Sequence, residues 1–367
     1  MDFKNIKFDC RHFKGDIPCI PNKLRGKLCT DCDEYSKISK RILIIKLGAM
    51  GDVIRTTPLL IKLKELYPDS HITWITNYPE ILPKSRIDNI LRMDYNALLF
   101  VQNSIFDIAL NFDKDKEACL LFKIASAKEK FGFSWSENHI IGLNHAAEDK
   151  ILTGIFDSYS KSNKKSYQHE IFEICGLKFN NEPNLLEVDE RLSKKWEVLK
   201  AKSHGKNIVG LNTGCGIRWR TRMWPFEYWI SLIKLLQDSD FFPLVLGGES
   251  EHQMNLSLSD ETKVYYPGHF SLEEFIAILN NCDIIVTAVS MSLHLGTGLG
   301  KPIVLFNNIF NKYEFELYGK GIILEPESGC DCYYGSECKR DRDCMFDIKP
   351  DVVFGSIQNL GGLNEVF

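Results

Sequence analysis

Short hydrophobic runs alternate with longer amphipathic stretches from residue 41 onwards. Apolar residues fill the runs at 41–47 (RILIIKL), 71–76 (HITWIT) and 106–112 (FDIALNF). Between the first two, Thr57 is placed to N-cap a helix that begins at Pro58 and continues as LLIKLKEL. Because strands that alternate with helices are typical of βαβ units, the pattern predicts a parallel sheet in this half of the chain.

A second series of the same kind follows a polar helix and linker at residues 180–206. In that series, Ser271 and Glu274 open an amphipathic helix at 271–282 as a capping box. Two such series predict an α/β protein with two Rossmann-like lobes, and ligands bind such lobes at the carboxyl ends of the strands, here in the cleft between them. The expected strands of the second lobe are 207–214, 241–248, 263–268, 283–288 and 301–308.

The composition adds little to this picture but excludes some functions. The chain has 367 residues, is 44% hydrophobic and 26% charged, and carries a formal net charge of −4. A nucleic-acid-binding protein needs a basic face, so nucleic acid is not expected as a partner. No apolar run approaches the roughly 20 residues of a membrane-spanning helix. The N-terminal residues contain no apolar signal segment, so we expect a cytoplasmic protein.

Cysteines gather at the two ends of the chain. In a reducing compartment, clustered cysteines are more often metal ligands than disulfides. Four thiolates suit Zn²⁺ or iron, and the C-x2-C pair of the first set is typical of such sites. We expect a structural metal at the first set. The second set, C-x-C-x5-C-x5-C, has a less standard zinc spacing and could bind iron, an iron–sulfur cluster or nothing, and a single site that draws on both ends is a further alternative. The candidate ligands are Cys10, Cys19, Cys29 and Cys32, and Cys330, Cys332, Cys338 and Cys344.

A glycine-rich turn follows the first predicted strand and carries one carboxylate, Asp52. The turn, GAMGD, is neither a dinucleotide-binding GxGxxG nor a P-loop. Gly51 lets the chain bend tightly and brings Asp52 to the rim of the sheet. There Asp52 is predicted to act as a general base with an ordinary pKa on an acceptor hydroxyl. The alternative is that Asp52 only caps a helix or turn.

Three arginines follow the first strand of the second lobe. Arg218, Arg220 and Arg222 suit bidentate recognition of a pyrophosphate and neutralisation of a departing nucleoside diphosphate. Thr213 and Gly214, at the end of the preceding strand, are assigned to the same donor site. The alternative is a solvated basic loop.

A strand passes into a helix near residue 290, and its free backbone N–H groups offer an anion site. The residues assigned to this site are Ser290, Met291, Ser292 and His294, although His294 alone is as often structural. After the strand at 241–248, Glu249 or Glu251 could accept hydrogen bonds from a ribose diol; a surface glutamate is the alternative for each.

RILIIKLGAMGDVIRTTPLLIKLKELYPDSHITWIT resembles the opening of the bacterial heptosyltransferases, glycosyltransferase family 9, and the resemblance covers about residues 41–360. It implies a GT-B fold, with Asp52 as the base and Arg222, before MWP, as the residue that meets the donor phosphates. The family commonly has Asp-Thr-Gly where this chain has Val289, Ser290 and Met291, and that acid is associated with the donor sugar. With its cysteine-rich ends, the chain resembles a divergent branch; a related branch that modifies proteins carries cysteine-bound iron.

The cysteine-rich start of the chain, the hydrophobic pattern and the resemblance together predict four parts. They are a cysteine-rich metal-binding lobe (1–39), an N-terminal acceptor-side domain (40–185), a C-terminal donor-binding domain (186–345) and a tail that returns to the N-terminal domain (346–367).

From this resemblance we expect an inverting glycosyltransferase that moves heptose from ADP-heptose to a cell-envelope glycan of the lipopolysaccharide core type, or to a protein. A lipid-linked acceptor would bring peripheral contact with the inner membrane, and an oligomer is open. The alternatives are a nucleotide-sugar epimerase or hydrolase, and a non-catalytic metal-stapled binding protein with a degenerate transferase cleft.

Overall fold

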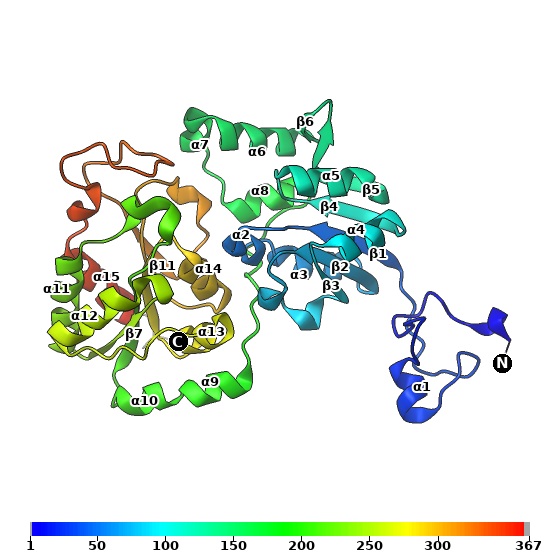
Figure 1. Ribbon diagram of the computed structural model, residues 1–367, viewed down its shortest axis with the longest axis horizontal. Coiled ribbons are helices and arrows are strands. Elements are labelled where there is room, and N and C mark those ends of the chain that lie inside the picture. Colours follow the sequence, from blue (N-terminus) through cyan, green and yellow to red (C-terminus); the bar gives the residue numbers. More distant parts are fainter. Residues whose placement is uncertain (1, 363–367) are drawn as a thin grey trace.

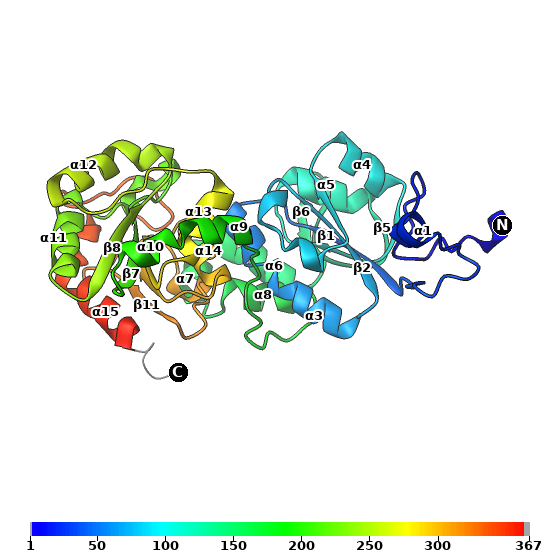
Figure 2. The same cartoon turned by 90° about the horizontal axis from the view of Figure 1, so that it is seen from below.

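The computed structural model describes residues 2–362, apart from the side chains of residues 217–219. Two α/β lobes lie side by side, and a small lobe formed by the N-terminal residues stands at the far end of the first of them (Figure 1). Figure 2 shows the same order from below, with the second α/β lobe and the N-terminal lobe at opposite ends. The N-terminal lobe is therefore remote from the junction of the two sheets.

The N-terminal lobe has little regular structure. It contains a 3-10 turn, η1 (Phe3–Asn5), and one short helix, α1 (Ile20–Arg25). Arg11 ties it to the first sheet, because its guanidinium pairs with Asp88 and donates to the carbonyl oxygen of Ser70 at 2.9 Å.

The first sheet has the strand order β3-β2-β1-β4-β5-β6. All neighbouring pairs are parallel except the last, in which β6 folds back antiparallel onto β5. The three strands expected from the hydrophobic pattern are confirmed as β1, β2 and β4. The bounds are β1 (Lys40–Ile45), β2 (Ser70–Thr76), β3 (Asn89–Arg92), β4 (Ile105–Asn111), β5 (Ser126–Ser136) and β6 (His139–Gly142).

Helices cover both faces of this sheet. The predicted start at Pro58 is confirmed with Thr57 at the N-cap position, but the Thr57 side chain does not cap the helix. Its hydroxyl instead donates to the carbonyl oxygen of Ile54 at 2.6 Å and accepts from the backbone N–H of Leu185 at 2.7 Å. The elements are α2 (Met50–Ile54), α3 (Pro58–Leu66), η2 (Pro79–Ile81), η3 (Lys84–Arg86), α4 (Tyr95–Gln102), α5 (Lys116–Ile124), α6 (His145–Ile155), α7 (Asp157–Ser162) and α8 (Tyr167–Ile174).

The second sheet is parallel throughout, in the order β11-β10-β9-β7-β8. The strand expected at 263–268 is wrong. There only Tyr265 forms an isolated bridge, to Leu244, and Pro267 lacks the N–H that continued pairing needs. The fifth strand is β11 instead, which follows the expected run at 301–308. The bounds are β7 (Asn207–Asn212), β8 (Phe241–Leu246), β9 (Ile284–Ala288), β10 (Ile303–Phe306) and β11 (Gly321–Leu324).

Helices again flank the sheet. Ser271 caps α13 by accepting from the N–H of Glu274 at 3.4 Å, but the Glu274 carboxylate accepts from Trp196 Nε1 at 3.1 Å rather than completing the capping box. The elements are α9 (Glu190–Trp196), α10 (Val198–Lys202), η4 (Ile217–Arg222), α11 (Phe226–Gln237), η5 (Glu249–Glu251), α12 (His252–Thr262), α13 (Leu272–Asn280), α14 (Met291–Gly298), η6 (Lys312–Glu314), η7 (Cys344–Asp347) and α15 (Pro350–Gly362).

The described part of the tail, residues 346–362, does not return to the first lobe as expected. Helix α15 lies against α11 and strands β9 to β11. The apolar side chains along one face of this helix are buried in the core of the second lobe, which is the apolar surface nearest to them. They are Val353, Ile357 and Leu360. In residues 2–362, no helix is long and apolar enough to cross a membrane.

The two lobes meet through α2 and α14 (Figure 1). Each helix follows the carboxyl end of a central strand, α2 after β1 and α14 after β9. The predicted arrangement of two sheets whose carboxyl ends face one cleft is therefore confirmed, and the candidate residues lie there.

Candidate functional site

The turn that carries Asp52 is held by a second carboxylate. Asp113, which follows β4, accepts from the backbone N–H of Leu47 and, at 3.3 Å, from that of Gly48. It also pairs with the ammonium group of Lys46, which is 3% exposed. A buried, paired carboxylate thus fixes the loop between β1 and α2 before Asp52 is reached.

Asp52 lies in the first turn of α2 between two cations. Arg55 donates to its Oδ1 atom from Nε at 3.0 Å and from Nη2 at 2.7 Å. Lys46 Nζ lies 3.8 Å from Oδ2. Burial opposes ionisation of Asp52, but the charges of Arg55 and Lys46 outweigh it and hold the pKa of the carboxyl well below its usual range. The expectation of an ordinary pKa is therefore wrong, because the sequence did not reveal these cations as neighbours.

His294 of the second lobe lies directly against this turn. A Cβ atom placed on Gly51 would stand 2.1 Å from His294 Cδ2, so only glycine allows the approach. Burial, helped by the charge of Arg55, lowers the pKa of His294 to about 3, and its ring is neutral. The structure thus brings together Gly51, Asp52 and His294 from the two lobes, as the sequence predicted.

Arg222 connects two loops on the second lobe. Its Nη1 donates to the carbonyl oxygen of Val289 and its Nη2 to that of Cys215. Burial lowers the pKa of Arg222, which is 8% exposed. The guanidinium therefore places a positive charge beneath the start of α14 while it ties that start to η4.

The residues that open α14 have the geometry expected of an anion site. Ser290 precedes the helix in extended conformation, and its hydroxyl lies 3.0 Å from the Thr287 hydroxyl. Met291 and Ser292 are the first residues of the helix, where backbone N–H groups have no partner within the helix. Helix α14 thus presents its N-terminus in the cleft, above the charge of Arg222.

The remaining donor-site candidates are arranged less uniformly. A Cβ atom on Gly214 would lie 2.6 Å from Glu251 Cδ, so these two residues adjoin. Glu251 accepts from the backbone N–H of Gly248 at 3.0 Å, and the buried Thr213 hydroxyl donates to Asn255 Oδ1 at 2.7 Å. Arg220 and Glu249 are exposed. The side chain of Arg218 lies outside the described residues.

Four residues of the site were missed from the sequence. Lys46 and Asp113 could have been noticed, since a lysine at the end of an apolar strand and an acid at the end of another strand meet at one sheet edge. Arg55 follows Asp52 by three residues, a spacing that pairs side chains on a helix. Tyr167, whose ring lies 4.0 Å from the Arg55 guanidinium carbon, carries no such signal.

A small polar cavity of about 10 Å³ lies between the lobes beside this site. Of its wall, Arg55 and Gln168 come from the first lobe and His294 and Glu314 from the second. Two buried atoms of these residues, Arg55 Nη1 and Gln168 Oε1, find no hydrogen-bond partner among the residues that the structure describes.

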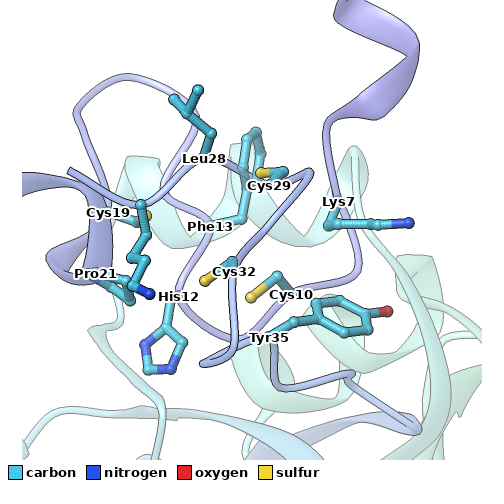
Figure 3. A pocket seen from close by; sticks show the side chains of 11 residues that line it. Lys7, Cys10, His12, Phe13, Cys19, Pro21, Leu28, Cys29, Cys32 and Tyr35 are labelled. Atoms are coloured by element: carbon cyan, nitrogen blue, oxygen red, sulfur yellow. The ribbon is translucent and has the colours of Figure 1, made fainter. Parts of the chain in front are cut away.

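The four cysteines of the first set gather around one cavity of about 40 Å³ in the N-terminal lobe. Figure 3 shows the sulfur atoms of Cys10 and Cys32 turned toward the same space. Cys19, Cys29 and His12 also line it, together with apolar and basic side chains. The donor set matches what zinc or iron requires.

The second set also lies together, in the loop between β11 and α15. The sulfur atoms of Cys330 and Cys332 are 3.2 Å apart, Cys344 contacts Cys330, and Cys338 contacts Cys332. The cysteines of the described chain form no disulfide bond. Among the residues that the structure describes, no three His, Cys, Asp or Glu side chains are already spaced to hold a metal ion. Within the described residues, each cluster thus brings together thiols of the kind that bind zinc or iron, but not at the spacing that a bound metal would need.

Two Rossmann-like lobes, with an ionised carboxylate on one and a helix N-terminus over an arginine on the other, define a two-lobed GT-B glycosyltransferase. The model of glycosyltransferase family 9 (heptosyltransferase) matches residues 100–312, and the chain belongs to this family. The family assignment makes the protein a glycosyltransferase, as the sequence motifs predicted.

Three individual proteins show how far the similarity extends. The lipopolysaccharide core heptosyltransferase OpsX of Haemophilus influenzae is 18% identical over 89% of this chain and 99% of its own. The ADP-heptose lps heptosyltransferase II of E. coli has a TM-score of 0.65 at 16% identity, over 89% of this chain and 99% of its own. The iron-containing dodecameric glycosyltransferase TibC of enterotoxigenic E. coli has a TM-score of 0.51 at 12% identity, over 89% and 80%.

Proposed function

We propose that the protein transfers heptose from ADP-heptose, with inversion, to a hydroxyl of a lipopolysaccharide-core type glycan. The family and the names of its relatives support the donor and the acceptor class. The observation that carries the proposal is the contact between the Asp52 turn of the first lobe and the helix α14 residue His294 of the second. When a base and an anion site are in contact, an acceptor hydroxyl can attack the same carbon from which the diphosphate departs.

In the proposed reaction, Asp52 acts on the acceptor. Its carboxylate takes the proton of the acceptor hydroxyl, whose oxygen bonds to the anomeric carbon as the bond to the diphosphate breaks. A weakly basic carboxylate suffices because the attacked carbon is oxocarbenium-like, so the proton leaves late. The His294 ring is neutral, so it adds no charge of its own beside the Asp52 carboxylate and the acceptor hydroxyl.

The second lobe acts on the leaving group. The first N–H groups of α14, at Met291 and Ser292, point to where a diphosphate would sit. Arg222 stabilises negative charge there from beneath, and the exposed Arg220 can reach the phosphates directly. Glu251, beside Gly214, is assigned to the ribose diol.

Calorimetric titration with ADP-heptose, UDP-glucose and GDP-mannose tests the donor. We expect selective binding of ADP-heptose, and an Arg222→Ala variant should bind it more weakly because a positive charge under the phosphates is lost. Preference for a uridine or guanosine donor would discard heptose, and the absence of binding to all three would favour a degenerate cleft.

Asp52→Ala tests the base. We expect turnover to fall to background while ADP-heptose binding stays within about twofold of wild type, because Asp52 lies on the acceptor lobe. Release of ADP in the presence of lipopolysaccharide that lacks heptose is the measurement. Comparable turnover in the variant would reject Asp52 as the base.

Val289 is relevant to which sugar the donor site selects. It stands where the family commonly has an acid, is 7% exposed and packs in the core, so it offers no hydrogen bond to a sugar hydroxyl. We propose that this chain holds the heptose through other contacts, and Val289→Asp should change the preference among ADP-sugars more than the affinity for ADP.

For the cysteine clusters we propose structural Zn²⁺ or iron. The gathering of each set of four thiols supports this, as does the iron of TibC. Elemental analysis should find a metal that is lost in Cys32→Ser and in Cys332→Ser but kept in Cys175→Ser, which belongs to neither cluster. Equal metal content in all three variants would contradict the proposal.

We further propose that the protein works in the cytoplasm, with peripheral contact with the inner membrane where its lipid-linked acceptor lies. An oligomer is expected by analogy with dodecameric TibC. Cell fractionation and sedimentation velocity test these two points. Recovery in the periplasm, or a strictly monomeric protein, would contradict them.

A further inference from the structure

The side chain of Arg55 is fixed on three sides within the cleft. Its Nε and Nη2 atoms both donate to Asp52 Oδ1, at 3.0 and 2.7 Å. Its guanidinium carbon lies 4.0 Å from the centre of the Tyr167 ring, a cation–π distance. The side chain is 12% exposed. Such a guanidinium cannot change its orientation without losing several interactions at once.

This geometry makes the two oxygens of Asp52 unequal. Oδ1 accepts two hydrogen bonds from Arg55, whereas Oδ2 accepts none from the described residues and lies 3.8 Å from Lys46 Nζ, beyond hydrogen-bond distance. Oδ2 is thus the oxygen with lone pairs left for an acceptor hydroxyl. Arg55 selects it by occupying the other.

The hydrogen-bonded pair of Arg55 and Asp52 is anchored within the first lobe. The Thr56 hydroxyl donates to the Asp52 carbonyl oxygen at 2.7 Å and lies 3.4 Å from the Tyr167 hydroxyl. Helix α8 therefore fixes the ring that supports Arg55 and, through Thr56, the backbone of Asp52. Among the described residues, the third nitrogen, Arg55 Nη1, is buried without a hydrogen-bond partner, and Arg55 is one of the residues that line the interlobe cavity.

From this arrangement we infer that Arg55 is a positioning residue, which orients the Asp52 carboxylate so that Oδ2 faces the acceptor hydroxyl. The inference rests on the proposed role of Asp52 as the base and deepens it. Arg55 bonds no reacting atom in this scheme; it acts through Asp52.

The charge of Arg55 also governs the protonation of Asp52. Without it, the pKa of Asp52 rises because the largest charge that opposes the effect of burial is lost. The pKa of His294 rises too, since Arg55 contributes to lowering it. The groups around Asp52 and Arg55 are Lys46 after β1, Asp113 after β4, Tyr167 on α8, His294 on α14 and Glu314 on η6.

Arg55→Met and Arg55→Lys separate orientation from charge. With ADP-heptose and heptose-free lipopolysaccharide, Arg55→Met should lower kcat about 10²-fold, the cost of a misplaced catalytic group, with ADP-heptose affinity within about twofold of wild type. The acid limb of its pH profile should move to higher pH. Arg55→Lys should restore the acid limb, since the charge returns, but only part of kcat, since the fork of two donors does not.

Three controls keep the outcomes distinct. Arg191→Met alters an arginine whose side chain is 91% exposed and should behave as wild type. His294→Asn combined with Arg55→Met should keep the shifted acid limb, which then belongs to Asp52. Thermal unfolding reports on any loss of fold.

Two results would overturn the inference. One is an Arg55→Met variant with the kcat and acid limb of wild type; the other is a loss of ADP-heptose binding as large as the loss of kcat. Turnover by Asp52→Asn equal to wild type would instead reject the proposed base. Absence of wild-type turnover would reject the proposed donor or acceptor and, with it, the inference.

Discussion

At the scale of single residues, the closest approach between the lobes depends on one missing side chain. Gly51 leaves room for the His294 ring, and a Cβ atom there would overlap the ring at 2.1 Å. The overlap involves a ring that is half-buried between the lobes, so the neighbour has little room to swing away. Backbone and ring would have to separate instead.

Gly51→Ala should therefore destabilise the protein and impair transfer. Overpacking typically costs about 1–3 kcal/mol, and we expect a loss of this size in the free energy of unfolding. Gly355→Ala is the matched control: it lies in α15 with no atom within 4 Å of the added Cβ, and it should raise stability by about 0.5–1 kcal/mol. Urea unfolding of both variants is the measurement. Equal stability of the two would show that the His294 ring relaxes freely.

His294 also predicts how stability depends on pH. Its pKa is about 3 in the folded protein against an ordinary 6.5 when unfolded. Between these values the unfolded chain binds a proton that the folded protein does not, so stability falls as the pH is lowered through this window. His294→Asn should remove that contribution and flatten the dependence. Unfolding free energies at several pH values between about 4 and 7 measure it; an unchanged slope would contradict the burial of a neutral ring.

The sequence reached Asp52 because a strand, a glycine turn and an acid form a local pattern. The sequence did not predict the lowered pKa of that acid. The pKa of Asp52 depends on Lys46 and Arg55, and the fixing of the turn depends on Asp113, which is far away in the chain. Pairings of this kind follow from which strand ends are neighbours, so they become visible only once the strand order is known.

At the scale of elements, periodicity identified most strands but not the edge of the second sheet. Residues 263–268 are apolar and aromatic, yet only Tyr265 pairs. β11 has the four residues GIIL and was hidden by its shortness. The hydrophobicity of a segment indicates whether it can form a strand. Strand pairing also requires a free edge of the sheet, and β10 offers that edge to β11.

The loop of the C-terminal cysteines supports η4, the element that ends at Arg222. Thr221 donates from its hydroxyl to the carbonyl oxygen of Gly335 at 3.2 Å, and its own carbonyl oxygen accepts from Asn308 Nδ2 at 2.7 Å. Asn308 is buried and also approaches Cys344 Sγ at 3.6 Å. One amide thus connects η4 to the cysteine cluster.

Asn308→Ala should loosen η4 and weaken the donor site. Loss of a buried hydrogen-bonding group costs about 1–3 kcal/mol, so we expect binding of ADP to weaken severalfold by calorimetry. Asn103→Ala, which removes an amide from an exposed bond to the Leu99 carbonyl, is the control and should leave ADP affinity unchanged. A stability loss in Asn308→Ala without any loss of ADP affinity would separate η4 from the donor site.

At the scale of the whole molecule, the lobes are held together by close packing as well as by polar contacts. A Cβ atom on Gly298 of α14 would lie 3.0 Å from Leu186 Cβ and 3.5 Å from Ile54 Cγ2 of α2. Nearby, Asn184 Nδ2 donates to the Thr297 hydroxyl at 2.9 Å. The separation of the lobes is thus set by a small residue at their interface.

Gly298→Val should hold the lobes apart. We expect a larger radius of gyration by X-ray scattering and a lower kcat, while ADP binding, which we propose takes place on the second lobe, stays near wild type. Gly355→Val places the same side chain in an open part of α15 and controls for the helix propensity of valine. Unchanged scattering together with unchanged kcat would show that the interface yields without opening.

The two-lobed architecture followed from the sequence because each lobe repeats the same alternation of strands and helices. The path of the tail did not. An apolar stripe such as that of α15 shows that a helix is buried but not against which surface, and both lobes offer apolar faces. Its position on the second lobe was decided by the contact of Trp224 Nε1 with the Ile348 carbonyl oxygen at 2.8 Å and by the core beneath it.

Because α15 stays on the second lobe, the described chain passes from one lobe to the other only once. Strands β1 to β6 belong to one sheet and β7 to β11 to the other, so a single cut between α8 and α9 leaves each fragment with every strand of its own sheet. Recombination between related genes at that one junction can exchange an entire lobe without threading one piece through the other. Under the proposed division of acceptor and donor binding between the lobes, the two preferences can be inherited from different parents.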